Sequence, residues 1–261
     1  MPSYLVHTIA GEKLMKHLSL TEEEKNQFFI SNLLPDVKEK INTEGLSKEE
    51  IRNQTQIKKR ITHFRTEFNH AFEYPDLNYF LSKYKESVKN DIKVFGYFFH
   101  LYTDYYYFKN YLPTIITFLD KDENISPRRE DNKYVIIKNK NKRMDHEDFW
   151  DNTNKDSLYQ EYSRLNKLLV RDYNIQINPK KLQDYIKKKN YKIDIEEVNP
   201  EGMNTILNQI SDIIKEAKEG VPEELIIFTE KQITDMIEKI VTSFLKDYKK
   251  IIPKRNIDNK Y

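Results

Sequence analysis

The segment Ile92-Lys-Val-Phe-Gly-Tyr-Phe-Phe-His-Leu-Tyr-Thr-Asp-Tyr-Tyr-Tyr-Phe108 has the length of a helix and is apolar or aromatic on almost every side. Such a helix is stable only where other helices surround it, so the segment predicts an all-α fold, a multi-helix bundle built around it. His100 and Asp104 lie in its middle, one turn apart on the same face. Gly96 lies one turn earlier on that face, where the missing side chain leaves room for a ligand or a second helix.

Helical periodicity continues outward from this segment in both directions. Capping boxes that begin at Thr21, Ser47 and Thr229 predict the starts of three helices, and Pro35 predicts the end of the first of them. The other helices that we expect span residues 5–18, 57–72, 76–86, 92–110 and 148–173. Three amphipathic helices should follow residue 179, the last of them starting at Thr229.

A polar stretch over residues 120–157 interrupts this pattern and predicts a long excursion over the surface. Between Lys133 and Arg143 it holds five basic residues and no acidic ones, and residues 134–137 could form a short strand. The excursion follows the helix that carries His100 and Asp104, so it could fold back over that helix as a lid. The alternative, which the polar sequence favours, is a solvated loop. The candidate cations of a lid are Arg128, Arg129, Lys133 and Arg143.

The chain divides into two regions of different character. Residues 1–175 are expected to form a helical metal-binding domain, and residues 176–261 a C-terminal helical extension packed on it. Histidine does not occur after His146, and the last expected helix carries a regular apolar stripe. The C-terminal region is therefore expected to contribute packing and no chemistry.

Composition limits the function further. The 44 basic and 42 acidic residues leave a net charge of only +2, which gives no reason to expect nucleic acid held by bulk electrostatics. With no cysteine, any metal must be bound by His, Asp, Glu or backbone oxygen. The chain shows no signal-peptide pattern and no apolar run near the roughly 18 residues of a transmembrane helix. A cytoplasmic protein without a membrane span is expected.

Asp104 needs a partner, because an unpaired charge in an apolar interior is very costly. A metal bound together with His100 is one solution, and a structural His–Asp hydrogen bond is the other. His7, Asp36 and His63 also stand among apolar neighbours. Each has a common structural role available to it, but together they form a set of nitrogen and oxygen donors suited to zinc.

An N-terminal His, then Pro-Asp, then Thr-His-Phe, then His-x-x-x-Asp on an apolar helix resembles the zinc-dependent phospholipase C family. These motifs are His7, Pro35-Asp36, Thr62-His63-Phe64 and His100 with Asp104, and the resemblance covers about residues 1–175. It implies a helical fold of the phospholipase C type and zinc ligation by all five His and Asp residues. It further implies that Asp104 can bridge two metals and that Asp36 can orient or deprotonate the attacking water as a catalytic residue.

Two departures from the family pattern reduce the expected metal content to one or two zinc ions. Secreted members also use their mature N-terminal amine and an adjacent Trp carbonyl, whereas this chain begins with Met-Pro. They carry a further His shortly after His-x-x-x-Asp, whereas residues 105–111 contain none. A later carboxylate could close the site. Glu161 is the first candidate, and Asp148, Asp151 and His146 are weaker ones.

The resemblance implies a zinc-dependent hydrolase of phosphoester or phospholipid-like substrates, acting through a metal-bound hydroxide. The alternative is a non-catalytic or degenerate helical metal-binding protein that acts through a protein partner, which the sequence leaves unidentified. A phosphohydrolase of the His-Asp dipeptide class is disfavoured, because no His-Asp dipeptide occurs in the chain.

Overall fold

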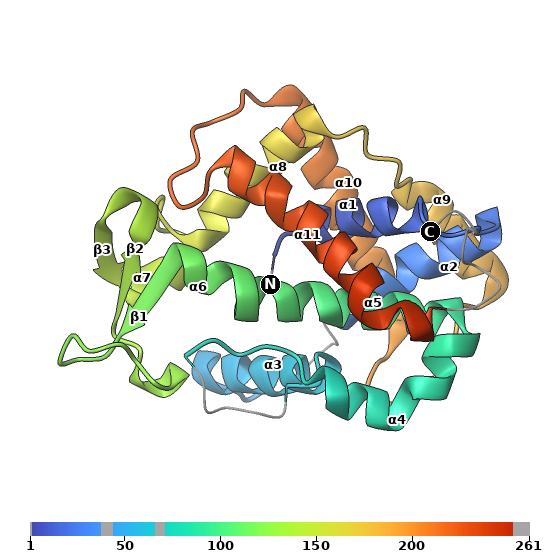
Figure 1. Ribbon diagram of the computed structural model, residues 1–261, viewed down its shortest axis with the longest axis horizontal. Helices are drawn as coiled ribbons and strands as arrows, with labels where there is room; N and C mark the ends of the chain where they lie inside the picture. Colours follow the sequence, from blue (N-terminus) through green and yellow to red (C-terminus); the bar gives the residue numbers. More distant parts are fainter. Residues whose placement is uncertain (1, 38–43, 66–70, 253–261) are drawn as a thin grey trace.

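A computed structural model describes residues 2–37, 44–65 and 71–252 of the chain. Helix α5 (Ile92–Tyr105) runs through its centre, and twelve of its fourteen residues are buried. It packs against α2 (Glu22–Leu33) and α4 (Leu77–Asn90), with α1 (Tyr4–Met15) and α11 (Glu230–Tyr248) also in contact (Figure 1). The expected bundle around this segment is therefore confirmed.

Helices α2 and α5 come unusually close because of one glycine. A Cβ atom on Gly96 would lie 2.8 Å from the carbonyl oxygen of Phe28 and would also clash with the Ser31 hydroxyl. Only a residue without a side chain allows this approach of the two backbones. The missing side chain of Gly96 therefore makes room for a neighbouring helix, α2, and not for a ligand.

The helix starts follow the capping signals. Thr21, Ser47 and Thr229 each cap a helix with a complete capping box, as expected. The helix expected over residues 57–72 begins earlier and ends at Thr62, because α3 spans Lys48–Thr62. Residues 66–70 of that expected helix lie outside the described part of the chain. The helix expected over 148–173 is divided into α7 (His146–Trp150) and α8 (Leu158–Asp172).

A small antiparallel sheet forms around the polar excursion, with its first strand just before residue 120, while the fold is broadly all-α as expected. Strands β1 (Ile116–Leu119), β2 (Tyr134–Ile137) and β3 (Lys142–Asp145) lie in the order β1-β2-β3. The strand expected at 134–137 is confirmed, and it pairs with strands on both sides. In Figure 1 the sheet occupies one end of the molecule. A π-helical segment, η2 (Tyr106–Tyr111), and α6 (Leu112–Ile115) connect it to α5.

The three amphipathic helices expected after residue 179 are present as α9 (Pro179–Lys189), α10 (Met203–Glu219) and α11. Phe244 of α11 packs its ring against Phe95, Phe98 and Phe99 of α5. One continuous cluster of buried residues includes side chains from both parts of the chain. The division into two domains at residue 175 stays a prediction. Within the described residues, none of the helices is both long and apolar enough to cross a membrane.

Candidate metal centre

Five residues that are far apart in sequence converge in the interior. His7 comes from α1, Asp36 from the 3-10 turn η1 (Leu34–Asp36), His63 from the end of α3, and His100 and Asp104 from α5. Asp36 is 6% exposed and the other four are 0% exposed. Each imidazole has its Nε2 within 4.0 Å of a carboxylate oxygen. His7 Nε2 lies 3.3 Å from Asp104 Oδ1, and His100 Nε2 lies 4.0 Å from Asp36 Oδ1. His63 Nε2 lies 3.1 Å from Asp36 Oδ1 and 3.6 Å from Asp104 Oδ2.

The His100 ring is held in one tautomer by α2. Its Nδ1 lies 2.7 Å from the carbonyl oxygen of Asn32. A carbonyl oxygen can only accept, so Nδ1 carries the proton and Nε2 presents its lone pair toward Asp36. A backbone carbonyl that fixes one imidazole nitrogen and leaves the other for an ion is the usual support of a metal-binding histidine.

His63 is oriented in the same way by its own helix. Its Nδ1 donates to the carbonyl oxygen of Lys59 at 2.9 Å, which leaves Nε2 facing oxygen atoms of Asp36 and Asp104. A neutral His63 would therefore direct a lone pair at two carboxylates. A cation between these three groups turns that repulsion into attraction.

His7 lies flat against His100. The two rings stack with their centroids 3.9 Å apart and their planes 5° apart. Burial, followed by the neighbouring His7, lowers the pKa of His100 to about 3, so this ring is neutral at physiological pH. Asn32 contacts both of these histidines. Its side-chain Nδ2 donates to the backbone carbonyl oxygen of His7 at 2.9 Å, and its backbone carbonyl oxygen accepts from His100 Nδ1.

Both carboxylates are ionised despite their burial. Burial alone would raise the pKa of Asp36 and of Asp104, but the adjacent imidazoles hold both values below the usual range. Four buried atoms that face the centre have no hydrogen-bond partner among the described residues: His7 Nε2, His100 Nε2, Asp36 Oδ2 and Asp104 Oδ1. Leaving such atoms unsatisfied costs about 1–3 kcal/mol each. Two imidazole nitrogens and two carboxylate oxygens left over beside one another fit a metal ion.

Two alternative triads of these residues could hold an ion, and they share the single free nitrogen of His100, Nε2. His7, Asp36 and His100 form one, and His63, His100 and Asp104 form the other, with ligand atoms within 4.8 Å of one another in each. The five residues expected to be ligands are thus brought together.

A tight turn after α3 places His63 and Arg65 on the same side. Phe64 takes the left-handed conformation, with φ of 51°. The amide of Arg65 donates to the Arg60 carbonyl at 3.0 Å and that of Phe64 to the Ile61 carbonyl at 3.1 Å, which is the Schellman pattern that reverses the chain at a helix end. The reversal returns Arg65 to the centre, where its Nη2 lies 3.5 Å from Asp104 Oδ2.

The expectation that Glu161 is a ligand is wrong. Glu161 is fully buried on α8, but its carboxylate accepts hydrogen bonds from the amides of Ile226, Ile227 and Phe228 at 2.7–2.9 Å. Its oxygens are therefore used to anchor the segment that leads into α11, and it belongs to neither triad.

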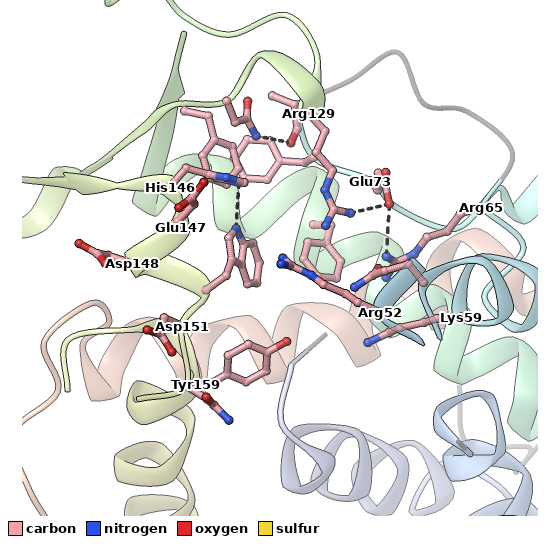
Figure 2. A pocket seen from close by; sticks show the side chains of 18 residues that line it. Arg52, Lys59, Arg65, Glu73, Arg129, His146, Glu147, Asp148, Asp151 and Tyr159 are labelled. Atoms are coloured by element: carbon pink, nitrogen blue, oxygen red, sulfur yellow. Dashed lines mark hydrogen bonds and ion pairs between the residues drawn. The ribbon is translucent and has the colours of Figure 1, made fainter. Parts of the chain in front are cut away.

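A pocket of about 1010 Å³ lies beside the centre and reaches it at Arg65. Figure 2 shows Arg52, Lys59 and Arg65 on one side of it, and Asp148 and Asp151 on the opposite side. The pocket thus has a basic wall, formed around α3, and an acidic wall, formed around α7. Phe72, Phe108, Phe118, Trp150 and Tyr159 add aromatic surface to its lining.

The excursion forms part of this pocket. Of its four candidate cations, only Arg129 lines the pocket, where its Nη1 donates to Glu73 Oε2 at 2.7 Å. Arg128 pairs with Asp131 at 3.0 Å, and Arg143 pairs with Glu123 at 2.7 Å. The excursion therefore contributes Arg129 to the pocket, and the choice between a lid and a solvated loop stays a prediction.

The weaker candidates from the excursion lie in the pocket and not in the centre. His146, Asp148 and Asp151 all line it. His146 accepts a hydrogen bond from Trp150 Nε1 at 3.0 Å, and burial, with Arg129 nearby, lowers its pKa to about 4. The ring is therefore neutral at physiological pH.

Sequence reasoning missed Asn32, Arg65 and Glu73. Asn32 stands in the apolar stretch Phe28-Phe-Ile-Ser-Asn-Leu-Leu34, and a buried amide there is a usable signal for a hydrogen-bonding role. Arg65 has no comparable signal, because its position depends on the left-handed turn at Phe64.

Comparison with known protein families, with curated proteins and with solved structures found no match for this chain. Membership of the zinc-dependent phospholipase C family therefore stays a prediction from the order of five residues in the sequence. The function must be inferred from the site itself.

Proposed function

We propose that this protein is a zinc-dependent phosphoester hydrolase whose metal centre is formed by His7, Asp36, His63, His100 and Asp104. One observation carries the proposal: five buried His and Asp side chains from four elements meet, and four of their inward-facing atoms lack a hydrogen-bond partner among the described residues. A structural hydrogen-bond network would satisfy these atoms.

The donor set suits zinc. Imidazole nitrogen and carboxylate oxygen are common zinc ligands, and the chain has no cysteine to offer instead. His63, His100 and Asp104 would hold one ion. A second ion, if bound, would be held by His7 together with a carboxylate of the centre.

Zinc at such a site supplies a hydroxide at neutral pH and neutralises charge on the phosphoryl group. The residues of the chain supply the rest. Asp36 Oδ2 is buried, has no hydrogen-bond partner among the described residues and belongs to a carboxylate with a lowered pKa, so it is suited to orient a water molecule by accepting a hydrogen bond from it. The basic wall of the pocket suits the anionic substrate.

A second candidate function is a metal site that serves only stability. Its support is the burial of all five ligands, with exposed fractions of 0–6%, since structural zinc sites are closed to solvent. A protein of this kind would bind zinc and hydrolyse nothing.

The two candidates are separated by metal analysis and activity on the same preparations. Protein purified without chelator should contain one or two zinc ions per chain and hydrolyse an activated phosphodiester or phosphomonoester. His100→Ala should lose zinc and activity together. Asp36→Asn should lower the rate about 100-fold, the scale expected when a reacting group is misplaced.

Asp148→Asn is the matched control, because Asp148 lines the pocket away from the centre. It should keep full zinc content and most of the activity. Zinc binding without turnover in the wild type would favour the structural site. A protein without bound zinc, even after refolding with the metal, would contradict both candidates.

A further inference from the structure

Three arginine side chains surround one buried glutamate at the inner end of the pocket. Glu73 is 6% exposed. Its oxygens lie 2.7 Å from Arg60 Nη2, 2.7 Å from Arg129 Nη1 and 3.8 Å from Arg65 Nη1. Figure 2 shows Glu73 between Arg129 and Arg65. A single carboxylate thus serves three guanidinium groups, and the cluster keeps an excess of positive charge.

Arg65 differs from the other two in being both buried and poorly paired. Its side chain is only 7% exposed, whereas those of Arg60 and Arg129 are each 37% exposed. Its two ion pairs, with Asp104 and Glu73, measure 3.5 Å and 3.8 Å, while charge-assisted N–H···O bonds are about 2.7–2.9 Å. Its buried Nε has no hydrogen-bond partner among the described residues.

A buried cation with such long contacts is costly unless an anion completes its environment. The Glu73 carboxylate is already held at 2.7 Å by two other arginines. The Asp104 carboxylate belongs to the metal centre. The remaining place for an anion is the pocket, which Arg65 itself lines.

The position of Arg65 is fixed from several directions. The left-handed turn at Phe64 sets its backbone, and its guanidinium lies over the Phe108 ring, 5.3 Å from the centroid. Glu73 and Asp104 stand on its two ends. A planar guanidinium fixed in this way is suited to bind two oxygens of a tetrahedral anion.

We propose that Arg65 is the anion-binding residue of this centre and contacts non-bridging oxygens of a phosphoryl group bound between the pocket and the metal ligands. The inference rests on the proposed function of the same site. It adds a recognition element that the five candidate ligands do not contain. The ligand class is a tetrahedral oxyanion, either free phosphate or the phosphoryl group of an ester.

Binding of inorganic phosphate to zinc-loaded protein tests the inference without requiring turnover. Isothermal titration calorimetry should show phosphate binding to the wild type, and Arg65→Gln should weaken it at least about 10-fold, as expected for loss of a buried charged contact. Arg128→Gln is the control, because Arg128 pairs with Asp131 at the surface. It should bind phosphate as the wild type does. Zinc content should be equal in all three proteins.

Arg65→Lys keeps the positive charge, so it provides a second test if Arg65→Gln does not fold. It lacks the planar fork and should bind phosphate several-fold more weakly than the wild type. Phosphate should also raise the melting temperature of the wild type and of Arg128→Gln, but much less that of either Arg65 variant. A purely structural role of Arg65 would lower the melting temperature and leave this phosphate-dependent increment unchanged.

The outcomes distinguish this inference from the proposed function. Zinc-loaded wild type that binds no phosphate, or Arg65 variants that bind it as tightly as Arg128→Gln, would overturn the role of Arg65 and leave the zinc centre in place. A wild type that binds no zinc would overturn the proposed function, and the inference with it.

Discussion

At the scale of single residues, the centre is organised by backbone carbonyl groups. The carbonyls of Asn32 and Lys59 each fix one imidazole of the pair His100 and His63, so that both rings present Nε2 inward. The side chain of Asn32 also holds the backbone of His7. The geometry is therefore set before any ion binds, which lowers the reorganisation that binding requires.

The five His and Asp residues could be predicted from sequence because each is a chemically active side chain among apolar neighbours. The backbone carbonyl groups that orient them could not be predicted, because every residue has a carbonyl group and its direction depends on the fold. Glu161 shows the same limit. Its setting on α8 made it a candidate ligand, but its partners are amides of residues 226–228, which lie on a distant segment.

His146 provides a pH-dependent test at this scale. Burial lowers its pKa to about 4 in the folded protein, against 6.5 for an ordinary histidine, so the unfolded chain binds more protons between these two pH values. Stability must then fall as the pH is lowered through this window. His63 and His100 act in the same direction, so the contribution of His146 requires a comparison of variants.

We expect His146→Gln, which can still accept from Trp150, to lose less stability than the wild type when the pH falls from 7 to 5. Chemical denaturation at both pH values measures this difference. Equal losses in the two proteins would contradict a depressed His146 pKa.

At the scale of elements, the helices were predictable and the sheet mostly was not. Capping boxes and apolar stripes are local signals, and the structure follows them at Thr21, Ser47 and Thr229. Strand β3 has the sequence Lys-Arg-Met-Asp, which carries no strand preference of its own. It forms by pairing with β2, and that pairing is a tertiary contact. The end of α3 could not be predicted either, because its left-handed position is occupied by Phe64 and not by the Gly or Asn that usually marks a helix end.

The anchor between α8 and the segment before α11 can be tested at Glu161. Glu161→Gln replaces one acceptor oxygen by an amide that faces backbone N–H groups. Unsatisfied buried groups of this kind cost about 1–3 kcal/mol, so the free energy of unfolding should fall by that amount. Zinc content should stay unchanged.

The control for this variant is Glu147→Gln on α7, an exposed residue that lines the pocket. It should have little effect on stability. Loss of zinc from Glu161→Gln would instead return Glu161 to the ligand set.

The close contact of α2 and α5 can be tested at Gly96. In Gly96→Ala the new methyl group would clash with the Phe28 carbonyl, 2.8 Å away, and must push the helices apart. Overpacking of this kind costs about 1–3 kcal/mol. Because α5 carries two ligands and α2 supports His100, zinc affinity should fall as well.

Gly220→Ala is the comparison. A Cβ atom there would lie 3.0 Å from the carbonyl oxygen of Glu216, and its other near neighbours are carbons of the flexible Lys167 side chain. It should change stability less and zinc affinity not at all. A Gly96→Ala protein with wild-type stability and zinc affinity would show that the two helices can separate freely.

At the scale of the whole molecule, the centre connects elements that the chain keeps far apart. Its candidate ligands span residues 7 to 104 and come from α1, η1, α3 and α5, so the unfolded chain holds no preformed site. Metal binding free energy is then added to folding free energy. Zinc should raise the melting temperature of the wild type in a concentration-dependent way.

Calorimetric melting of metal-free protein, with and without added zinc, measures this increment. His100→Ala should show none, because it lacks a residue shared by both triads. A wild-type melting temperature that does not respond to zinc would indicate that the ion does not link these helices.

The burial of the ligands also determines how fast an ion could exchange. The five side chains are 0–6% exposed, and Arg65, itself 9% exposed, lies between them and the pocket. An ion could enter or leave only when Arg65 swings away or a helix opens locally, and such openings are infrequent in a packed core. The dissociation rate would therefore be set by protein motion and not by the strength of the zinc–ligand bonds. Zinc taken up during folding would remain in the native protein through long dialysis against chelator, and only brief exposure to mild denaturant would release it.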